Sequence, residues 1–237
     1  MINYNDFQNK LDSIQYSENR FKLWMEDGRT VMVLSPSRVN DPKGTISMMR
    51  SVYKSVLELD WKIKVSLSIA AVHILKDDEN VNYCLPTDYS RKVATYYIEN
   101  ALFRLTSLWD MLAQGYRVLY DVKKNLKGKK IDIDHVKYKN FFDQTKTPHT
   151  DFEDEANRIF DYITKNCNHR TTNELRNQMA HKFTPNLFYA SNYTVNVPYP
   201  MSFQITTILE DYIKVTKFLS ELFDNAEKII ALQMNNL

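Results

Sequence analysis

Apolar residues recur at steps of three and four over long stretches of this chain, and this spacing constrains its fold more than any other feature. One series starts near Thr45 and contains Val52, Val56, Leu59, Ile63, Leu67, Ala70 and Ile74. Residues at these steps share one face of an α-helix, which can then be buried. Similar series occupy residues 88–125 and 203–233. The spacing therefore predicts three long amphipathic helices.

The segment 61–69, which overlaps the first series, also shows the alternation that is typical of a β-strand. The alternating apolar residues are Trp61, Ile63, Val65, Leu67 and Ile69. The helical register continues beyond this segment in both directions, which favours a helix. Glycine occurs only four times in 237 residues, which disfavours a fold built from many tight β-turns. We therefore predict an all-α fold, a helical bundle of four to five main helices.

The remaining elements are expected to be shorter. Helices are predicted over residues 4–19, 133–143 and 150–166, and from Thr171 or Thr172 onward. Thr150 and Glu153 have the spacing of a capping box at a helix start.

The N-terminal region differs in character from the helical remainder. Two alternating segments, residues 21–25 and 30–34, flank an Asp-Gly pair, which predicts a small β-hairpin. No repeat or linker divides the chain. We therefore expect one domain over residues 1–237, with an N-terminal extension at 1–44 and a helical core at 45–237.

Composition excludes several classes of protein. The net charge is only +2, so the chain lacks the strongly basic balance of a general nucleic-acid coat protein. Cys84 and Cys167 have neither zinc-site nor disulfide spacing, which is typical of a reducing cytoplasm. The N-terminus is polar and no apolar run is long enough for a membrane span. We expect a cytoplasmic protein without membrane contact.

The segment 175–181 contains the candidate catalytic residues Arg176, Asn177 and His181. Asn177 and His181 are four positions apart and share a helix face. Arginine is a permanent cation, and histidine transfers protons near neutral pH. Cleavage of an RNA backbone needs a group that takes the 2′-hydroxyl proton and a charge that stabilises the phosphate. The alternative is an exposed arginine and a histidine that interacts favourably with the helix C-terminus.

This Arg-Asn-x-x-Ala-His pattern resembles the signature of the HEPN superfamily (higher eukaryotes and prokaryotes nucleotide-binding). These are all-helical domains, and many are metal-independent ribonucleases of toxin–antitoxin and antiviral-defence systems. The segment 99–114 is also similar to the long helix of one bacterial branch. The resemblance implies an endoribonuclease that acts on RNA, needs no metal or cofactor, uses a dimeric Arg/His site and has an antitoxin or defence-system partner.

The resemblance also includes one departure. Some family toxins carry a tyrosine two positions after the histidine, where a partner enzyme can attach AMP. Phe183 stands at that position. It lacks the phenol oxygen, so this form of control is chemically excluded there.

Two acidic residues are candidates for a supporting role. Glu99 and Asp110 lie along one stripe of the predicted long helix, where an unpaired carboxylate is expensive to bury. In one interpretation Asp110 or Glu99 pairs with Arg176 or orients His181. In the other they make a structural contact, for example with Arg104 or Arg117.

Lysines gather at the end of this predicted helix. They are Lys123, Lys124, Lys127, Lys129 and Lys130. Such a run can bind RNA phosphates, but it also occurs as a solvated helix end.

The leading prediction is a metal-independent endoribonuclease that works as a homodimer, because each chain has one signature histidine while the reaction needs a base and an acid. The alternatives are a non-catalytic module of the same fold that binds RNA, a nucleotide or a partner protein, and a structural helical protein whose arginine and histidine are incidental.

Overall fold

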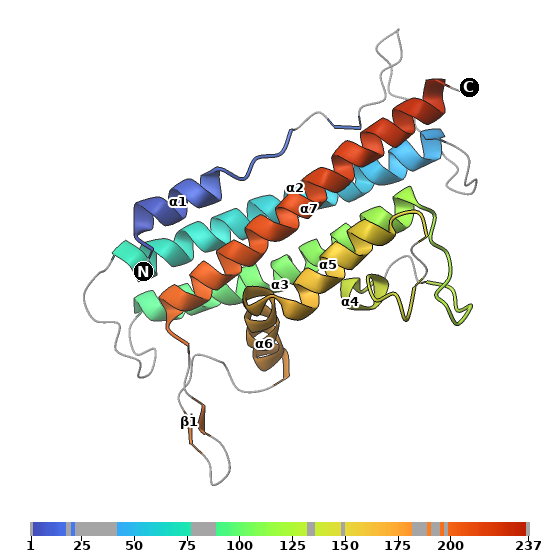
Figure 1. Cartoon of the computed structure of the whole chain (residues 1–237). Helices are drawn as coiled ribbons and strands as arrows, with labels where there is room; N and C mark the ends of the chain where they lie inside the picture. Colours follow the sequence, from blue (N-terminus) through green and yellow to red (C-terminus); the bar gives the residue numbers. More distant parts are fainter. Residues whose placement is uncertain are drawn as a thin grey trace. The chain divides into compact units, whose positions relative to one another are not determined.

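Helices make up nearly all of the regular structure (Figure 1). The computed structural model describes residues 2–17, 20–21, 42–76, 89–131, 136–147, 150–181, 189–190, 195–196 and 199–235. In chain order the helices are α1 (Tyr4–Asp12), α2 (Pro42–Ala71), the π-helical turn η1 (Val72–Lys76), α3 (Tyr89–Leu119), α4 (Tyr138–Phe141), α5 (Glu153–Lys165), α6 (Cys167–His181) and α7 (Met201–Asn235). The predicted all-α fold is confirmed.

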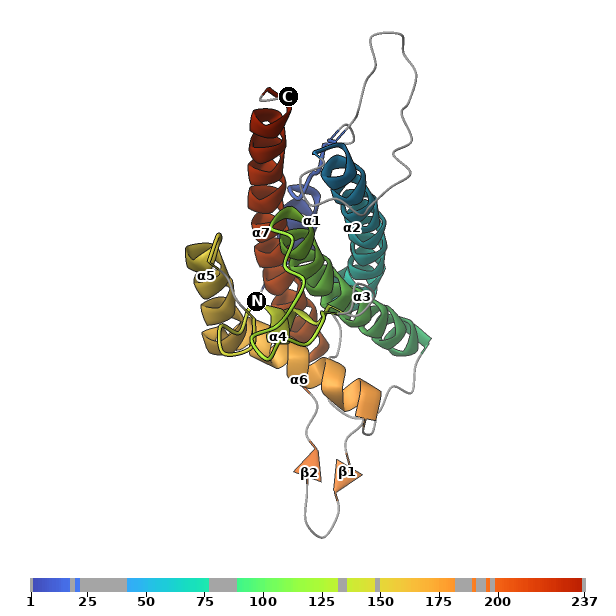
Figure 2. The same ribbon diagram turned by 90° about the vertical axis from the view of Figure 1, so that its right-hand side faces the viewer.

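Two short strands interrupt the helical pattern between α6 and α7 (Figure 2). β1 (Tyr189–Ala190) and β2 (Val195–Asn196) are antiparallel, with Tyr189 opposite Asn196. The hairpin predicted over 21–34 lies almost entirely outside the described residues.

The two competing patterns in α2 are resolved in favour of the helix. Ile63 and Leu67 are wholly buried, whereas Trp61 is 63% exposed. Strand alternation would place these three side chains on one face. A helix separates them, because Trp61 is two positions from Ile63 and six from Leu67.

Several helix ends differ from the prediction. One difference is at the end of α3, which stops at Leu119 rather than near residue 125. Asp121 has the left-handed φ of 48°, and the Val122 amide donates to the Arg117 carbonyl at 3.1 Å. These are features of a Schellman-type helix end, in which a short polar residue replaces the usual glycine.

The predicted starts of two helices were also wrong. α5 begins at Glu153, so Thr150 lies three residues before the helix rather than at its cap. α6 begins at Cys167 rather than at Thr171 or Thr172. In addition, α1 is shorter than the expected 4–19, and it ends at Asp12.

Contacts between Cα atoms divide the chain into two compact units. The first unit comprises Met1–Gln15, Leu59–Ser107 and Tyr162–Lys214. The second comprises Tyr16–Glu58, Leu108–Asp161 and Val215–Leu237. A single domain over residues 1–237 stays a prediction.

The core of the first unit is mainly aliphatic, with a buried polar contact inside it. Its wholly buried residues include Phe7, Leu11, Ile63, Leu67, Ile98, Leu102, Ile205, Ile208 and Leu209. Asp60 is also buried, and it accepts a hydrogen bond from the hydroxyl of Tyr212 and pairs with Lys64 Nζ at 2.9 Å. The carboxylate therefore has the partners that a buried charge requires.

The core of the second unit is aromatic. Trp109 lies 5.7 Å from Tyr138 and 6.0 Å from Phe218 between ring centroids. Tyr116 lies 5.1 Å from Phe152 and packs edge-on against Phe142. Such ring pairs stabilise a fold beyond the area that they bury.

A glycine allows close packing in this second core. A Cβ atom added to Gly115 of α3 would lie 2.4 Å from Leu222 Cδ2 of α7 and 3.7 Å from Val52 Cγ1 of α2. Leu222 is wholly buried, so it has little space into which to move.

We expect Gly115→Val to destabilise the protein by about 1–3 kcal/mol, because the added side chain overpacks this contact. Urea unfolding measures the change. Leu222→Ala vacates the space, so the double variant should be less destabilised than the sum of the two single variants. A Gly115→Val protein as stable as wild type would contradict this account of the contact.

Candidate functional site

Helix α6, which carries the predicted signature, has a well-defined start. The Asn166 side chain accepts from the backbone amides of Asn168 at 2.9 Å and His169 at 3.2 Å. This is the N-cap arrangement that satisfies otherwise unpaired amides at a helix start. Leu175 and Thr172 are buried on the inner face of the helix.

His169, in the first turns of α6, forms the most deeply buried polar contact near the signature. Its Nδ1 lies 3.0 and 3.2 Å from the two carboxylate oxygens of Asp211 on α7. His169 is 1% exposed and Asp211 is wholly buried. Both residues lie in the first unit. A buried carboxylate needs such partners, because removal from water disfavours its charge.

Tyr162 of α5 adds a third element to this contact. Its hydroxyl donates to Asp211 Oδ1 at 3.3 Å, and its ring centroid lies 5.9 Å from that of His169. Burial raises the pKa of the Tyr162 phenol, and the negative charge of Asp211 raises it further. The phenol therefore keeps its proton and acts as a donor.

Asn173 continues the polar face along α6. Its side-chain nitrogen lies 2.7 Å from His169 Nε2 and donates to the His169 carbonyl at 3.2 Å. His169, Asn173 and Arg176 lie at steps of four and three, so they share one face of the helix.

Arg176 is half-buried on this face. Its Nη1 donates to the side-chain oxygen of Asn177 at 3.1 Å. Its Nε is buried and has no acceptor among the residues that the structure describes. A buried donor without a partner is unfavourable unless a ligand supplies the acceptor. The guanidinium thus retains a donor that the described residues leave unpaired.

His181 is the last residue of α6. Arg176, Asn177 and His181 lie on one helix near its C-terminus, as the sequence predicted. Asn177 and His181 are four positions apart on that helix and therefore lie along one face. Phe183 lies outside the described residues.

The two predicted supporting acids lie in different units. Asp110 of α3 is in the second unit, where its Oδ1 accepts from the Tyr138 amide at 3.0 Å at the start of α4. The donor in this contact is a backbone amide and not the side chain of Arg104 or Arg117. Glu99 is half-buried in the first unit, and burial raises the pKa of its carboxyl. Pairing of either acid with Arg176 stays a prediction.

The predicted lysines lie on a folded loop rather than on a helix end. We call residues 122–131 the lysine loop. Lys124 and Lys130 form an antiparallel bridge within it. Lys123 pairs with Asp121 at 2.9 Å. The interpretation as a solvated helix end is therefore wrong in its geometry, because α3 has already ended at Leu119.

The sequence did not reveal the role of His169 as a buried contact. Its partner Asp211 is 42 residues away in the chain, and no motif connects them. A usable signal was present nearby, because His169 and Asn173 have the i, i+4 spacing of residues that share a helix face.

In the part of the chain that the structure describes, no group of three or more His, Cys, Asp or Glu side chains could hold a metal ion. Asp132, Asp134 and His135, which lie close together in the sequence and are of types that bind metals, fall outside that part. None of the described helices has the length and apolarity needed to cross a membrane.

The buried contact predicts a stability effect. We expect Asp211→Ala to destabilise the protein by about 2–5 kcal/mol, because it leaves buried polar partners without their acceptor. Tyr162→Phe, which removes one hydrogen bond, should destabilise it by about 1 kcal/mol. Urea unfolding measures both. Glu174→Ala, an exposed change on α6, is the control and should have almost no effect. Equal midpoints for Asp211→Ala and Glu174→Ala would show that Asp211 does not stabilise this unit.

Comparison with known proteins gives the family. The family described as Cthe2314-like HEPN matches residues 53–236, which is well over half of the chain. Comparison with curated proteins and with solved structures gave no match. The matched range contains α3, α5, α6 and α7, including the Arg-Asn-x-x-Ala-His segment. The chain therefore belongs to the HEPN superfamily, within its Cthe2314-like branch.

Proposed function

We propose that this protein is a metal-independent endoribonuclease whose chemistry is carried by Arg176 and His181 of α6. The observation that supports this most directly is the half-buried guanidinium of Arg176, whose Nε has no acceptor among the described residues. A phosphate oxygen is the acceptor that a guanidinium suits best.

In the proposed reaction, the 2′-oxygen of the RNA attacks the adjacent phosphorus. A bond forms between the 2′-oxygen and phosphorus, and the bond from phosphorus to the 5′-oxygen breaks. His181 takes the 2′-hydroxyl proton as a general base, or gives a proton to the leaving 5′-oxygen as a general acid. The products are a 2′,3′-cyclic phosphate and a free 5′-hydroxyl.

Arg176 stabilises the negative charge that grows on the phosphate oxygens in the transition state. Asn177, which accepts from Arg176, positions the guanidinium or the substrate. The buried pair of His169 and Asp211 acts two helical turns away from Arg176. It holds the start of α6 in place and touches no substrate, so its role is positioning.

The site is proposed to be shared between two copies of the chain. One copy supplies one signature histidine, whereas the reaction uses a base and an acid. A two-fold dimer supplies both, and such dimers are the commonest assembly.

An exposed aromatic stripe on α3 supports the dimer. Tyr89, Tyr96 and Phe103 are 80%, 60% and 44% exposed. They are seven residues apart, which is the spacing of a seam between packed helices. All three belong to the first unit, as does α6.

The proposed setting is a cytoplasmic toxin–antitoxin or antiviral-defence system, with an antitoxin or defence component as partner. The second candidate is a non-catalytic HEPN module that binds RNA, a nucleotide or a partner protein. The lysine loop favours this candidate, because it offers positive charge for binding apart from Arg176 and His181.

We expect His181→Ala to lower RNA cleavage by about a hundredfold to ten-thousandfold, because it removes the proton-transfer group. Arg176→Ala should have an effect of similar size. Arg176→Lys should recover little, since lysine lacks the planar fork of donors. Cleavage of a labelled RNA is followed by gel, with circular dichroism and melting as controls for folding.

The same assay separates this chemistry from others. Wild-type cleavage should persist in EDTA and leave cyclic phosphate ends. A strict magnesium requirement with 5′-phosphate ends would exclude the mechanism. Full activity of a folded His181→Ala protein would exclude the site.

The proposed dimer can be tested by comparing the mass in solution of wild type and a variant. We expect wild type to have twice the mass of one chain by light scattering, and Tyr96→Glu/Phe103→Glu to be monomeric, because two charges would be buried in the seam. The monomer should also lose cleavage. Leu232→Glu, at a 65% exposed position on α7, is the control and should remain dimeric. An active monomeric wild type would contradict the shared site.

A further inference from the structure

The lysine loop has a defined conformation. The Asn125 amide donates to the Lys129 carbonyl at 2.9 Å, and the Ile131 amide donates to the Lys123 carbonyl at 2.9 Å. Gly128 adopts a left-handed φ of 72°, which glycine tolerates without strain.

A side chain fixes the turn of this loop. Asn125 Oδ1 accepts from the amides of Lys127 at 3.0 Å and Lys129 at 2.9 Å. Asparagine often closes a turn in this way. The positions from which these lysines extend are thus set by the backbone, which is not the case in a frayed helix end.

The next loop in the chain anchors the lysine loop. The Leu126 amide donates to the Lys146 carbonyl at 2.9 Å. Lys146 Nζ in turn contacts Asp143 at 3.0 Å and Asn140 at 3.2 Å. The Thr147 hydroxyl donates to the Asn140 carbonyl at 3.3 Å.

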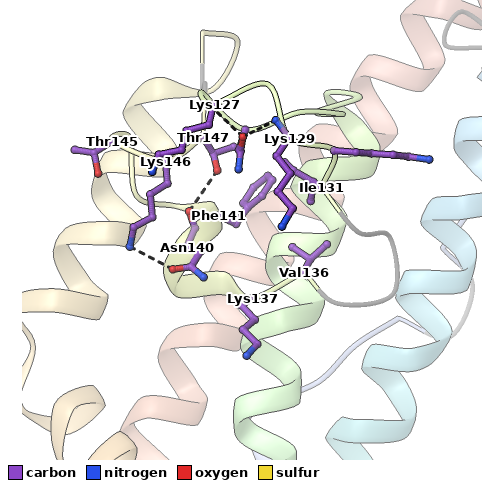
Figure 3. A pocket seen from close by; sticks show the side chains of 12 residues that line it. Lys127, Lys129, Ile131, Val136, Lys137, Asn140, Phe141, Thr145, Lys146 and Thr147 are labelled. Carbon is purple, nitrogen blue, oxygen red and sulfur yellow. Dashed lines mark hydrogen bonds between the residues drawn. The ribbon is translucent and has the colours of Figure 1, made fainter.

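A cavity of about 500 Å³ lies between these loops and α4 (Figure 3). Five lysines line it: Lys127, Lys129, Lys130, Lys137 and Lys146. Figure 3 shows Lys129 extending from the lysine loop toward Phe141. Ile131, Val136 and Phe141 form its apolar part. The volume is within the range of small-ligand sites.

Few of the described residues compensate the charge of this cavity. Lys146 is paired with Asp143. Among the described residues, the remaining four lysines have no acidic partner, and no acidic side chain lines the cavity. Like charges repel one another, and a multivalent anion would relieve this repulsion. The apolar part offers no acceptor that would compete with such an anion.

We propose that this cavity binds a group of two or more phosphates, supplied either by consecutive phosphodiesters of an RNA strand or by a polyphosphate. The site lies wholly in the second unit and uses no residue of α6. Lysines bind phosphate as point charges with rotatable donors, so they suit phosphates without fixing one ligand geometry. The binding therefore stands or falls independently of the proposed cleavage chemistry.

The test compares two variants that lose the same charge from the same unit. The cavity variant is Lys129→Gln/Lys130→Gln/Lys137→Gln. The control is Lys54→Gln/Lys217→Gln/Lys228→Gln, which removes exposed lysines outside the cavity. Two probes are used: inorganic tripolyphosphate, measured by calorimetry, and a labelled 2′-O-methyl oligoribonucleotide, measured by fluorescence anisotropy. The methylated strand binds as RNA but lacks the 2′-hydroxyl that cleavage requires.

We expect the cavity variant to bind at least one probe tenfold or more weakly than wild type, and the control to change by less than about twofold. The salt dependence of strand binding should also become shallower, by about 0.7 in log–log slope for each lost phosphate contact. Loss for tripolyphosphate assigns the site to polyphosphates, and loss for the strand alone assigns it to RNA. Equal binding by the cavity variant and the control, with both proteins folded, would overturn the proposal.

Discussion

The buried carboxylate of Asp211 is the constraint on which the geometry of the signature helix depends. A carboxylate that is removed from water needs hydrogen-bonding partners that replace the lost water. Here the ring of His169 and the hydroxyl of Tyr162 are those partners. These three residues come from α6, α5 and α7 and all lie in the first unit, so one charge ties three segments of that unit together. The catalytic candidates follow on the same helix, at positions set by its pitch.

The sequence predicted the parts of the fold that depend on a repeated pattern. The long helices α2, α3 and α7 follow from apolar spacing over many turns, and the chance placement of one residue barely alters that signal. Helix ends depend on single residues. The left-handed Asp121 ends α3, and the side chain of Asn166 caps the start of α6. Neither boundary was predicted, because many polar residues in the sequence could end or cap a helix and only the folded backbone selects one.

The candidate site divides in the same way. Arg176, Asn177 and His181 could be placed on one helix, because their relation is local in sequence. The Asp211–His169 contact could not be predicted, since it joins residues 42 positions apart without a spacing rule. The lysine run was visible as a composition. The conformation of the lysine loop could not be predicted. It is fixed by the side chain of Asn125 and by the backbone carbonyl of Lys146, and neither belongs to a motif that the sequence reveals.

The arginine of the signature has a consequence for how the reaction would respond to acidity. Arginine is a permanent cation, so the proton transfers of the proposed chemistry fall to histidine. Under the proposed chemistry, any variation of rate with pH then reports imidazole groups alone. A cleft in which one imidazole acts as base and its symmetry mate as acid loses rate on both sides of an optimum, whereas a single imidazole base loses it on the acid side only. The shape of one curve would thus count the histidines at work.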